Sequence, residues 1–277
     1  MTGFINVWKR EGDTSAYVVN RLKRLTRTPC GHMGTLDPLA SGVLPVGIGN
    51  ATRLFDYFLE KQKVYLAHFR FGVTTPTLDY ESEPIVGGCI PTAQEIEAVL
   101  PQFIGEIAQI PPVFSAKCVN GKRSYELARE GKEVSLAAKT VKIERLDLLE
   151  QIDRDEFTFR ITCGGGTYIR SLARDIAAAL GTQGFMSGLV REQSGVFSQD
   201  NAVLFEELTA ETVEKSLIRT EDVLPFPSMT VTDIRFYNGI HLPCDRTEGL
   251  YKIYNEDGFY GLARVTNGKL YPEKKLC

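Results

Sequence analysis

The sequence lacks the features that define several broad protein classes. No apolar run among its 277 residues approaches the roughly 20 residues that cross a bilayer, and the opening stretch MTGFINVWKREGDTS has no apolar signal-peptide core. The six cysteines are widely spaced and include no Cys-x-x-Cys pair, which argues against a zinc site or a disulfide framework. We therefore expect a cytoplasmic protein that does not contact a membrane.

The motifs of common enzyme classes are missing too. The sequence contains no Gly-x-Ser-x-Gly elbow and no Gly-x-x-x-x-Gly-Lys-Ser/Thr phosphate loop, and it has only three histidines. The stretch CGGGTYIR does not have the Gly-x-Gly-x-x-Gly spacing of a dinucleotide-binding loop. These absences disfavour a serine hydrolase, a P-loop enzyme and a dinucleotide-binding enzyme.

The net charge of −3 is distributed unevenly along the chain. Residues 1–75 carry ten Lys and Arg against five Asp and Glu. Four of these basic residues crowd a segment without acids: Arg21, Lys23, Arg24 and Arg27. A second basic stretch covers residues 117–145. Local potential rather than total charge attracts phosphates, so both stretches are candidate nucleic-acid contacts, although a solvated helix face explains them equally well.

The hydrophobic pattern mixes helical and strand periods. Apolar residues at helical spacing predict a helix with Thr14 or Ser15 as its N-cap: Val18, Val19, Leu22 and Leu25. KVYLAHFRFGV alternates like a strand, TYIRSLARDIAAALG reads as a helix, and the last fifty residues read as short strands and glycine turns. We predict an α+β fold with a mostly antiparallel mixed central sheet and flanking helices, divided into a main domain over 1–223, with an inserted arm at about 110–140, and a small β domain over 224–277.

One irregular segment draws attention. Between residues 30 and 50 the chain has five glycines and two prolines, which forbid regular structure over most of this stretch. His32 and Asp37 lie within it, and Pro38 restricts the backbone of Asp37 to extended conformations. Such a segment either turns a corner or presents side chains to a ligand, and an ordinary Asp-Pro turn is the simpler interpretation.

Three further residues are candidate site residues, and each of them also has an ordinary structural interpretation. Tyr65 lies on the apolar face of the expected strand, where a core role is usual. Tyr168 and Arg170 lie in the first turn of a helix that follows a strand and a glycine turn, where a surface role is usual. If Arg170 faced Asp37, it would keep that carboxylate ionised, as a nucleophilic or basic aspartate in a closed pocket requires.

Five blocks of the sequence resemble one known family. GHMGTLDPLASGVLPVGIGNATR is similar to the signature of the tRNA pseudouridine synthase B family, and four later blocks resemble that family in the same order: KVYLAHFRFGVTTPTLD, IPPVFSAKCVNGKRSYELAREG, GGGTYIRSLARDIAAALG and LVREQSGVF. The resemblance covers about residues 3–200. It implies a pseudouridine synthase fold, a short PUA-like C-terminal domain, and isomerisation of the T-loop uridine at tRNA position 55 to pseudouridine.

The resemblance also implies roles for individual residues. Asp37 falls on the family's essential aspartate, Arg170 on the arginine that pairs with it, and Tyr65 on the tyrosine that stacks on the target base and is proposed to help remove its C5 proton. The residues implied in substrate binding, besides Tyr65, are His32, Tyr168 and Leu189. Asp79 matches an acidic position near the cleft.

The implied reaction sets the expected partners. Nothing is oxidised and no group is imported, so we expect neither a cofactor nor a metal. The expected partner is the T arm of tRNA, bound by a monomer without a guide RNA. Two alternatives stay open: a pseudouridine synthase for another RNA, and a non-catalytic tRNA-binding folding module. The sequence departs from the family where Met33 replaces a small hydroxyl residue and where Lys117 precedes the expected lysine position, which Cys118 occupies.

Overall fold

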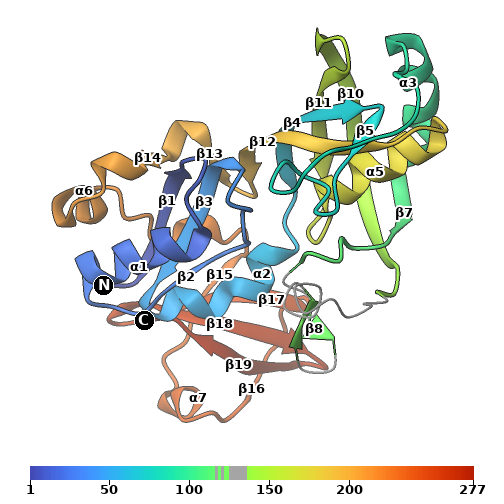
Figure 1. Cartoon of the computed structure of the whole chain (residues 1–277). Helices are drawn as coiled ribbons and strands as arrows, with labels where there is room; N and C mark the ends of the chain where they lie inside the picture. Colours follow the sequence, from blue (N-terminus) through green and yellow to red (C-terminus); the bar gives the residue numbers. More distant parts are fainter. Residues whose placement is uncertain (116–117, 120–121, 125–135) are drawn as a thin grey trace. The chain divides into compact units, whose positions relative to one another are not determined.

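The structure is a computed structural model that describes residues 1–115, 118–119, 122–124 and 136–277 (Figure 1). The chain divides into two compact units, each built from separate segments. Unit 1 comprises Met1–Asp37, Leu44–Phe58 and Asp200–Cys277, and unit 2 comprises Pro38–Val43 and Leu59–Gln199. This division is discontinuous in sequence, and the boundary near residue 224 stays a prediction. Lys117 lies outside the described residues.

The part of unit 1 that precedes its C-terminal sheet is built around three neighbouring strands. Its strand order is β14-β1-β3, with β1 parallel to β14 and β2 antiparallel to β3. The elements are β1 (Gly3–Lys9), α1 (Ser15–Thr26), β2 (Cys30–His32), β3 (Ser41–Ile48), η1 (Gly49–Leu54), α2 (Phe55–Leu59), η3 (Gln199–Asn201), β14 (Val203–Leu204), η4 (Phe205–Glu207), α6 (Ala210–Lys215) and η5 (Thr220–Val223). Strand β3 spans the division, because Ser41–Val43 count with unit 2. The expectation of irregular structure over most of residues 30–50 was wrong, because β2 and β3 pair there and only residues 33–40 and 49–50 lie outside them.

Helix α1 forms as its sequence predicts. The Thr14 side chain caps it by accepting a hydrogen bond from the Tyr17 amide, and the helix ends where Arg27 adopts a left-handed conformation. The apolar face is buried, including Val18 and Leu22. Of the two cap residues that the sequence allowed, Thr14 is the cap.

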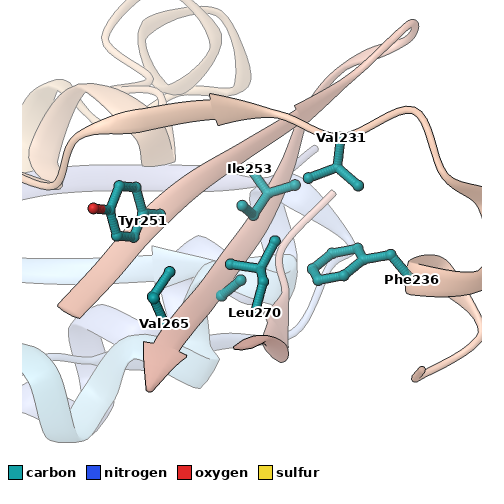
Figure 2. Close-up of a cluster of buried hydrophobic side chains, with 7 residues drawn as sticks. Val231, Phe236, Tyr251, Ile253, Val265 and Leu270 are labelled. Atoms are coloured by element: carbon teal, nitrogen blue, oxygen red, sulfur yellow. The ribbon is translucent and has the colours of Figure 1, made fainter. Parts of the chain in front are cut away.

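The C-terminal part of unit 1 is a separate sheet with its own core. Its order is β15-β17-β18-β19-β16, built from β15 (Ser228–Thr230), β16 (Leu242–Pro243), β17 (Gly249–Asn255), β18 (Gly258–Thr266) and β19 (Lys269–Lys275), with the short helix α7 (Ile234–Tyr237). Figure 2 shows the buried side chains that converge on this core: Val231, Phe236, Tyr251, Ile253, Ala263, Val265 and Leu270. The small C-terminal β structure is thus confirmed.

Unit 2 carries the larger sheet. Its strands run in the order β12-β4-β11-β10-β7, all neighbours antiparallel, while β13 pairs with β12 and the first residues of β3 run parallel to β12. The elements are β4 (Lys63–Phe71), β5 (Val73–Thr74), β6 (Ile85–Val86), α3 (Ala93–Val99), η2 (Leu100–Phe103), β7 (Gly105–Gln109), β8 (Cys118–Val119), β9 (Lys122–Arg123), β10 (Lys139–Asp153), β11 (Glu156–Cys163), α5 (Ile169–Ala179), β12 (Gly184–Ser194) and β13 (Phe197–Ser198).

The predicted alternation in β4 and the predicted helix α5 are both present. The odd-numbered residues of β4 are buried, including Tyr65 and Phe69. Helix α5 packs against this sheet (Figure 1). It approaches β12 so closely that a Cβ on Gly184 would lie 2.8 Å from the Cβ of Ala177. The α+β class with a mostly antiparallel mixed sheet is confirmed. No helix within the described ranges is both long enough and apolar enough to cross a bilayer.

A substitution at Gly42 tests the contact between β3 and β12 within unit 2. Its φ is +108°, and a Cβ there would lie 2.3 Å from the carbonyl oxygen of Arg191. We expect Gly42→Ala to lower the free energy of unfolding by about 3 kcal/mol or more, because strain and overlap add. Urea unfolding measures the loss. Gly181→Ala is the matched control, since Gly181 has a φ of +67° with nothing within 4 Å of a new Cβ, and should lose about 1 kcal/mol. Equal losses in the two variants would contradict the overlap.

Candidate active site

The loop that carries Asp37 is held from inside unit 1. The hydroxyl of buried Ser15 donates to the carbonyl of Leu36 and accepts from its amide, both at 2.9 Å. Further back, the Met33 amide donates to the carbonyl of Pro45 at 2.8 Å. A buried hydroxyl therefore satisfies both backbone groups of the residue just before Asp37. Asp37 itself is half-buried, as is His32 at the end of β2.

The segment that follows Asp37 belongs to unit 2 and pairs with β12. Ser41 lies opposite Val190, and Gly42 lies opposite Arg191. The Arg191 side chain is only 1% exposed, and its Nε donates to the carbonyl of Val43 at 2.7 Å. The buried guanidinium thus anchors the start of β3 to β12. The anchored residues follow Pro38 by no more than five positions.

Tyr65 and Leu189 lie on one face of the unit 2 sheet. Leu189 on β12 pairs with Ala67 on β4, and Arg191 pairs with Tyr65. Because opposite residues of antiparallel strands point to the same face, and because i and i+2 do as well, the side chains of Tyr65, Leu189 and Arg191 share that face. Tyr65 and Leu189 are each 8% exposed. One face of the sheet thus carries an aromatic ring and an apolar side chain, and their roles in base binding stay predictions.

Arg170 lies in the first turn of α5 and is buried in an ion pair with Asp79. Its Nη1 is 3.0 Å from Oδ2 of Asp79, and both side chains are less than a tenth exposed. Nη1 also donates to the carbonyl of Thr77 at 3.0 Å, and Nη2 donates to that of Phe114 at 3.1 Å. The pairing of Arg170 with Asp37 stays a prediction, whereas Asp79, which the resemblance matched to an acidic position near the cleft, is an observed carboxylate partner.

The turn that carries Asp79 is itself constrained. Leu78 has a positive φ of 60°, an uncommon conformation for a side chain of its size. The Asp79 carboxylate accepts hydrogen bonds from the Thr77 hydroxyl at 2.5 Å and from the Glu81 amide at 3.0 Å. The amide of Met186, on β12, donates to the carbonyl of Leu78 at 3.1 Å. These contacts fix the carboxylate that faces Arg170.

Lys63 is a buried lysine on β4 that the sequence analysis did not single out. It lies two residues before Tyr65. Its ammonium group donates to the carbonyls of Leu59 and Lys61, each at 2.6 Å. Burial, together with the positive charge of Arg191, lowers the pKa of Lys63 to about 8. A charged residue at an inward position of an alternating strand is the signal that marks both Lys63 and Arg191 in the sequence.

The basic segment of α1 divides into two kinds of residue. Arg21 is engaged within unit 1, since its Nη2 donates to the carbonyl of Leu208 at 2.8 Å and its guanidinium lies 4.6 Å from the centre of the Phe205 ring. Lys23, Arg24 and Arg27 are exposed. The exposed three are therefore the better candidates for contacts with phosphates.

Metal ligands do not gather in the part of the chain that the structure describes. Among those residues, no three His, Cys, Asp or Glu side chains form a group that could hold an ion. The expectation that neither metal nor cofactor is needed stays a prediction.

Comparisons with known proteins place this geometry in a family. The model of the TruB family pseudouridylate synthase N-terminal domain matches residues 23–169. The tRNA pseudouridine synthase B of Clostridium novyi is 39% identical, with both chains covered completely. That of Nostoc sp. is 37% identical over 99% of this chain and 98% of its own. A protein chain in the crystal structure of a Cbf5-Nop10-Gar1 complex superposes with a TM-score of 0.74 at 26% identity, covering 99% of this chain and 85% of that one.

These matches define the class first and then the family. The fold is that of the pseudouridine synthases, as the sequence predicted. The chain belongs to the TruB family of pseudouridylate synthases.

Asp79→Asn tests the buried ion pair. Removing the negative charge leaves the Arg170 guanidinium buried without its carboxylate, so we expect the free energy of unfolding to fall by about 3 kcal/mol. Denaturant titration followed by circular dichroism measures this loss. Glu211→Gln, which breaks the exposed pair with Lys215, serves as the control and should cost at most about 0.5 kcal/mol. A loss below about 1 kcal/mol for Asp79→Asn would show that the pair contributes little.

Lys63 makes stability depend on pH in a defined window. Below pH 8 its ammonium group is charged in both the folded and the unfolded protein. Between about 8 and 10.5 the folded protein releases this proton while the unfolded chain keeps it, so stability rises with pH. We expect wild type to gain about 1–2 kcal/mol relative to Lys63→Met between about pH 7.5 and 9.5. Urea unfolding of both proteins at each pH measures the difference, and a constant difference would contradict the lowered pKa.

Proposed function

We propose that the protein isomerises the T-loop uridine at position 55 of tRNA to pseudouridine. The observation that carries this proposal is similarity along the whole chain to relatives named tRNA pseudouridine synthase B, at 37–39% identity. The arrangement of the candidate residues supports it. A loop held at Leu36 carries the aspartate, and one face of a sheet carries Tyr65 and Leu189.

The reaction needs no atom beyond those of the substrate. The bond between C1′ of the ribose and N1 of uracil breaks, the base turns, and a bond from C1′ to C5 forms. The C5 proton is lost, and N1 gains a proton. Asp37 serves this exchange in one of two ways. It attacks the sugar or the uracil as a nucleophile, or it acts as the general base that takes the 2′ proton of the sugar. In this proposal Tyr65 contacts the base that is being turned.

The target base has to leave its stack before it reacts. Flipping a nucleotide costs a few kcal/mol, and stacking on an aromatic side chain returns about 1–3 kcal/mol. Tyr65 supplies that surface, Leu189 closes the pocket beside it, Tyr168 lines it, and His32 occupies the space that the base leaves in the T loop. Arg170, paired with Asp37, completes the set of catalytic residues in this proposal.

The rest of the RNA is held by charge. Lys23, Arg24 and Arg27 bind phosphates of the T arm in this proposal, because they are exposed and close together in sequence. The protein acts as a monomer in the cytoplasm, without metal or cofactor. It acts without a guide RNA, although the solved relatives include a chain from an H/ACA RNP bound to a substrate RNA. The higher identity to the full-length tRNA pseudouridine synthase B proteins supports action on tRNA alone.

Tritium release tests the proposal directly. The purified protein is incubated with an unmodified tRNA transcript tritiated at uridine C5, and the modified position is mapped by sequencing. We expect about one equivalent of tritium released from the T loop. Asp37→Asn should reduce the rate at least about 1,000-fold and change the tRNA dissociation constant less than about threefold, because the aspartate acts in the chemical step.

The controls separate the alternatives. Asp56→Asn removes an exposed carboxylate from α2 and should react like wild type. Unchanged release by Asp37→Asn would refute the role of Asp37. Tight tRNA binding without release by wild type would favour a folding module, and release only from another RNA, or only with an added guide RNA, would refute action on tRNA alone.

A further inference from the structure

Gln109 is a buried amide that contacts the start of helix α5. It is the last residue of β7, it is 1% exposed, and its Cα partner in the sheet is Lys139 on β10. Its Nε2 donates to the carbonyl of Tyr168 at 3.1 Å, and its Oε1 accepts from the amide of Tyr168 at 2.8 Å. Both ends of the amide are therefore used by the backbone of one residue.

That residue is the N-cap of α5. Its own side chain makes no capping hydrogen bond, and the first amides of a helix have no partner within the helix. Gln109, from β7, instead binds the amide and the carbonyl of the cap residue, and this carbonyl also accepts the first hydrogen bond of the helix, from the Leu172 amide. Only one orientation of the amide fits, because the Tyr168 amide is a donor and its carbonyl is an acceptor.

The residues after Gln109 extend this contact along α5. The carbonyl of Ile110 accepts from the Ser171 hydroxyl at 2.9 Å and from Nη2 of Arg174 at 3.0 Å. The Phe114 carbonyl accepts from Arg170. Three groups of one segment, 109–114, thus hold the first turns of the helix, and Gln109 is the member closest to the helix start.

We propose that Gln109 is a positioning residue, which sets the direction of Tyr168 and Arg170 by fixing the first turn of α5. This inference rests on the proposed function, in which those two residues serve the uridine. Gln109 lies at the end of a strand that is fixed by its ladder to β10, so it transmits a rigid position to the helix. Small displacements of catalytic groups cost large factors in rate, and supporting contacts commonly carry such effects.

Two substitutions separate the donor half of the contact between Gln109 and Tyr168 from its acceptor half. Gln109→Leu removes both hydrogen bonds, and Gln109→Glu keeps an acceptor for the Tyr168 amide while setting a second acceptor against the Tyr168 carbonyl. We expect the single-turnover rate of tritium release to fall at least about tenfold in each, with a larger loss in Gln109→Leu. The tRNA dissociation constant should change less than about threefold. Gln151→Leu, which removes an exposed amide on β10 that donates to the carbonyl of Arg154 in the turn after this strand, should keep the wild-type rate.

A double-mutant cycle distinguishes positioning from a general structural role. If Gln109 acts through Arg170, then Gln109→Leu added to Arg170→Lys should lower the rate less than about threefold, because the two losses overlap. Fully multiplicative losses would overturn the inference. So would a wild-type rate in Gln109→Leu, or a rate loss that tracks loss of folded protein in thermal unfolding. Should Gln109→Leu fail to fold, Gln109→Glu carries the same cycle. Wild type is assayed first, so failure of the proposed function is seen separately from failure of this inference.

Discussion

The guanidinium of Arg170 is the interaction around which the candidate site in unit 2 is built. A charge buried this deeply is costly unless a counter-charge and hydrogen bonds compensate it. Asp79 supplies the counter-charge, and the carbonyls of Thr77 and Phe114 supply further acceptors. The requirement to satisfy one side chain therefore holds two loops, distant in sequence, against the start of a single helix.

Two further candidate segments, one in each unit, follow the same physical rule with neutral groups. Ser15 binds both backbone groups of Leu36, and Gln109 binds both of those of Tyr168. In each case a buried polar side chain satisfies the backbone beside a residue proposed to contact the RNA. Loops are ordinarily the less rigid parts of a protein, so these contacts give loop residues the precision that chemistry requires.

Within unit 1, the C-terminal sheet is attached to the N-terminal segments by side-chain hydrogen bonds as well as by the chain that precedes it. Arg53, in η1, donates to the carbonyl of Lys275, and Lys274 donates to the carbonyl of Arg53. Asn50, at the start of η1, donates to the carbonyl of Cys277. The 3-10 helix η1 directly follows β3, and β3 pairs with β2, which ends at His32. The end of the chain therefore supports the segment next to a candidate substrate-binding residue.

The sequence by itself determined the local structure and the identity of the chemical groups. Alternation predicted β4 and the helical spacing predicted α1, because such patterns depend on neighbours in the chain. The family resemblance carried by the motifs predicted roles for Asp37, Tyr65 and Arg170. The tertiary structure alone decided which buried groups meet. Nothing in the sequence shows that Arg170 pairs with Asp79, or that Gln109 binds the backbone of Tyr168, because such contacts depend on the register of strands and on the closure of loops between residues about 60 to 90 positions apart.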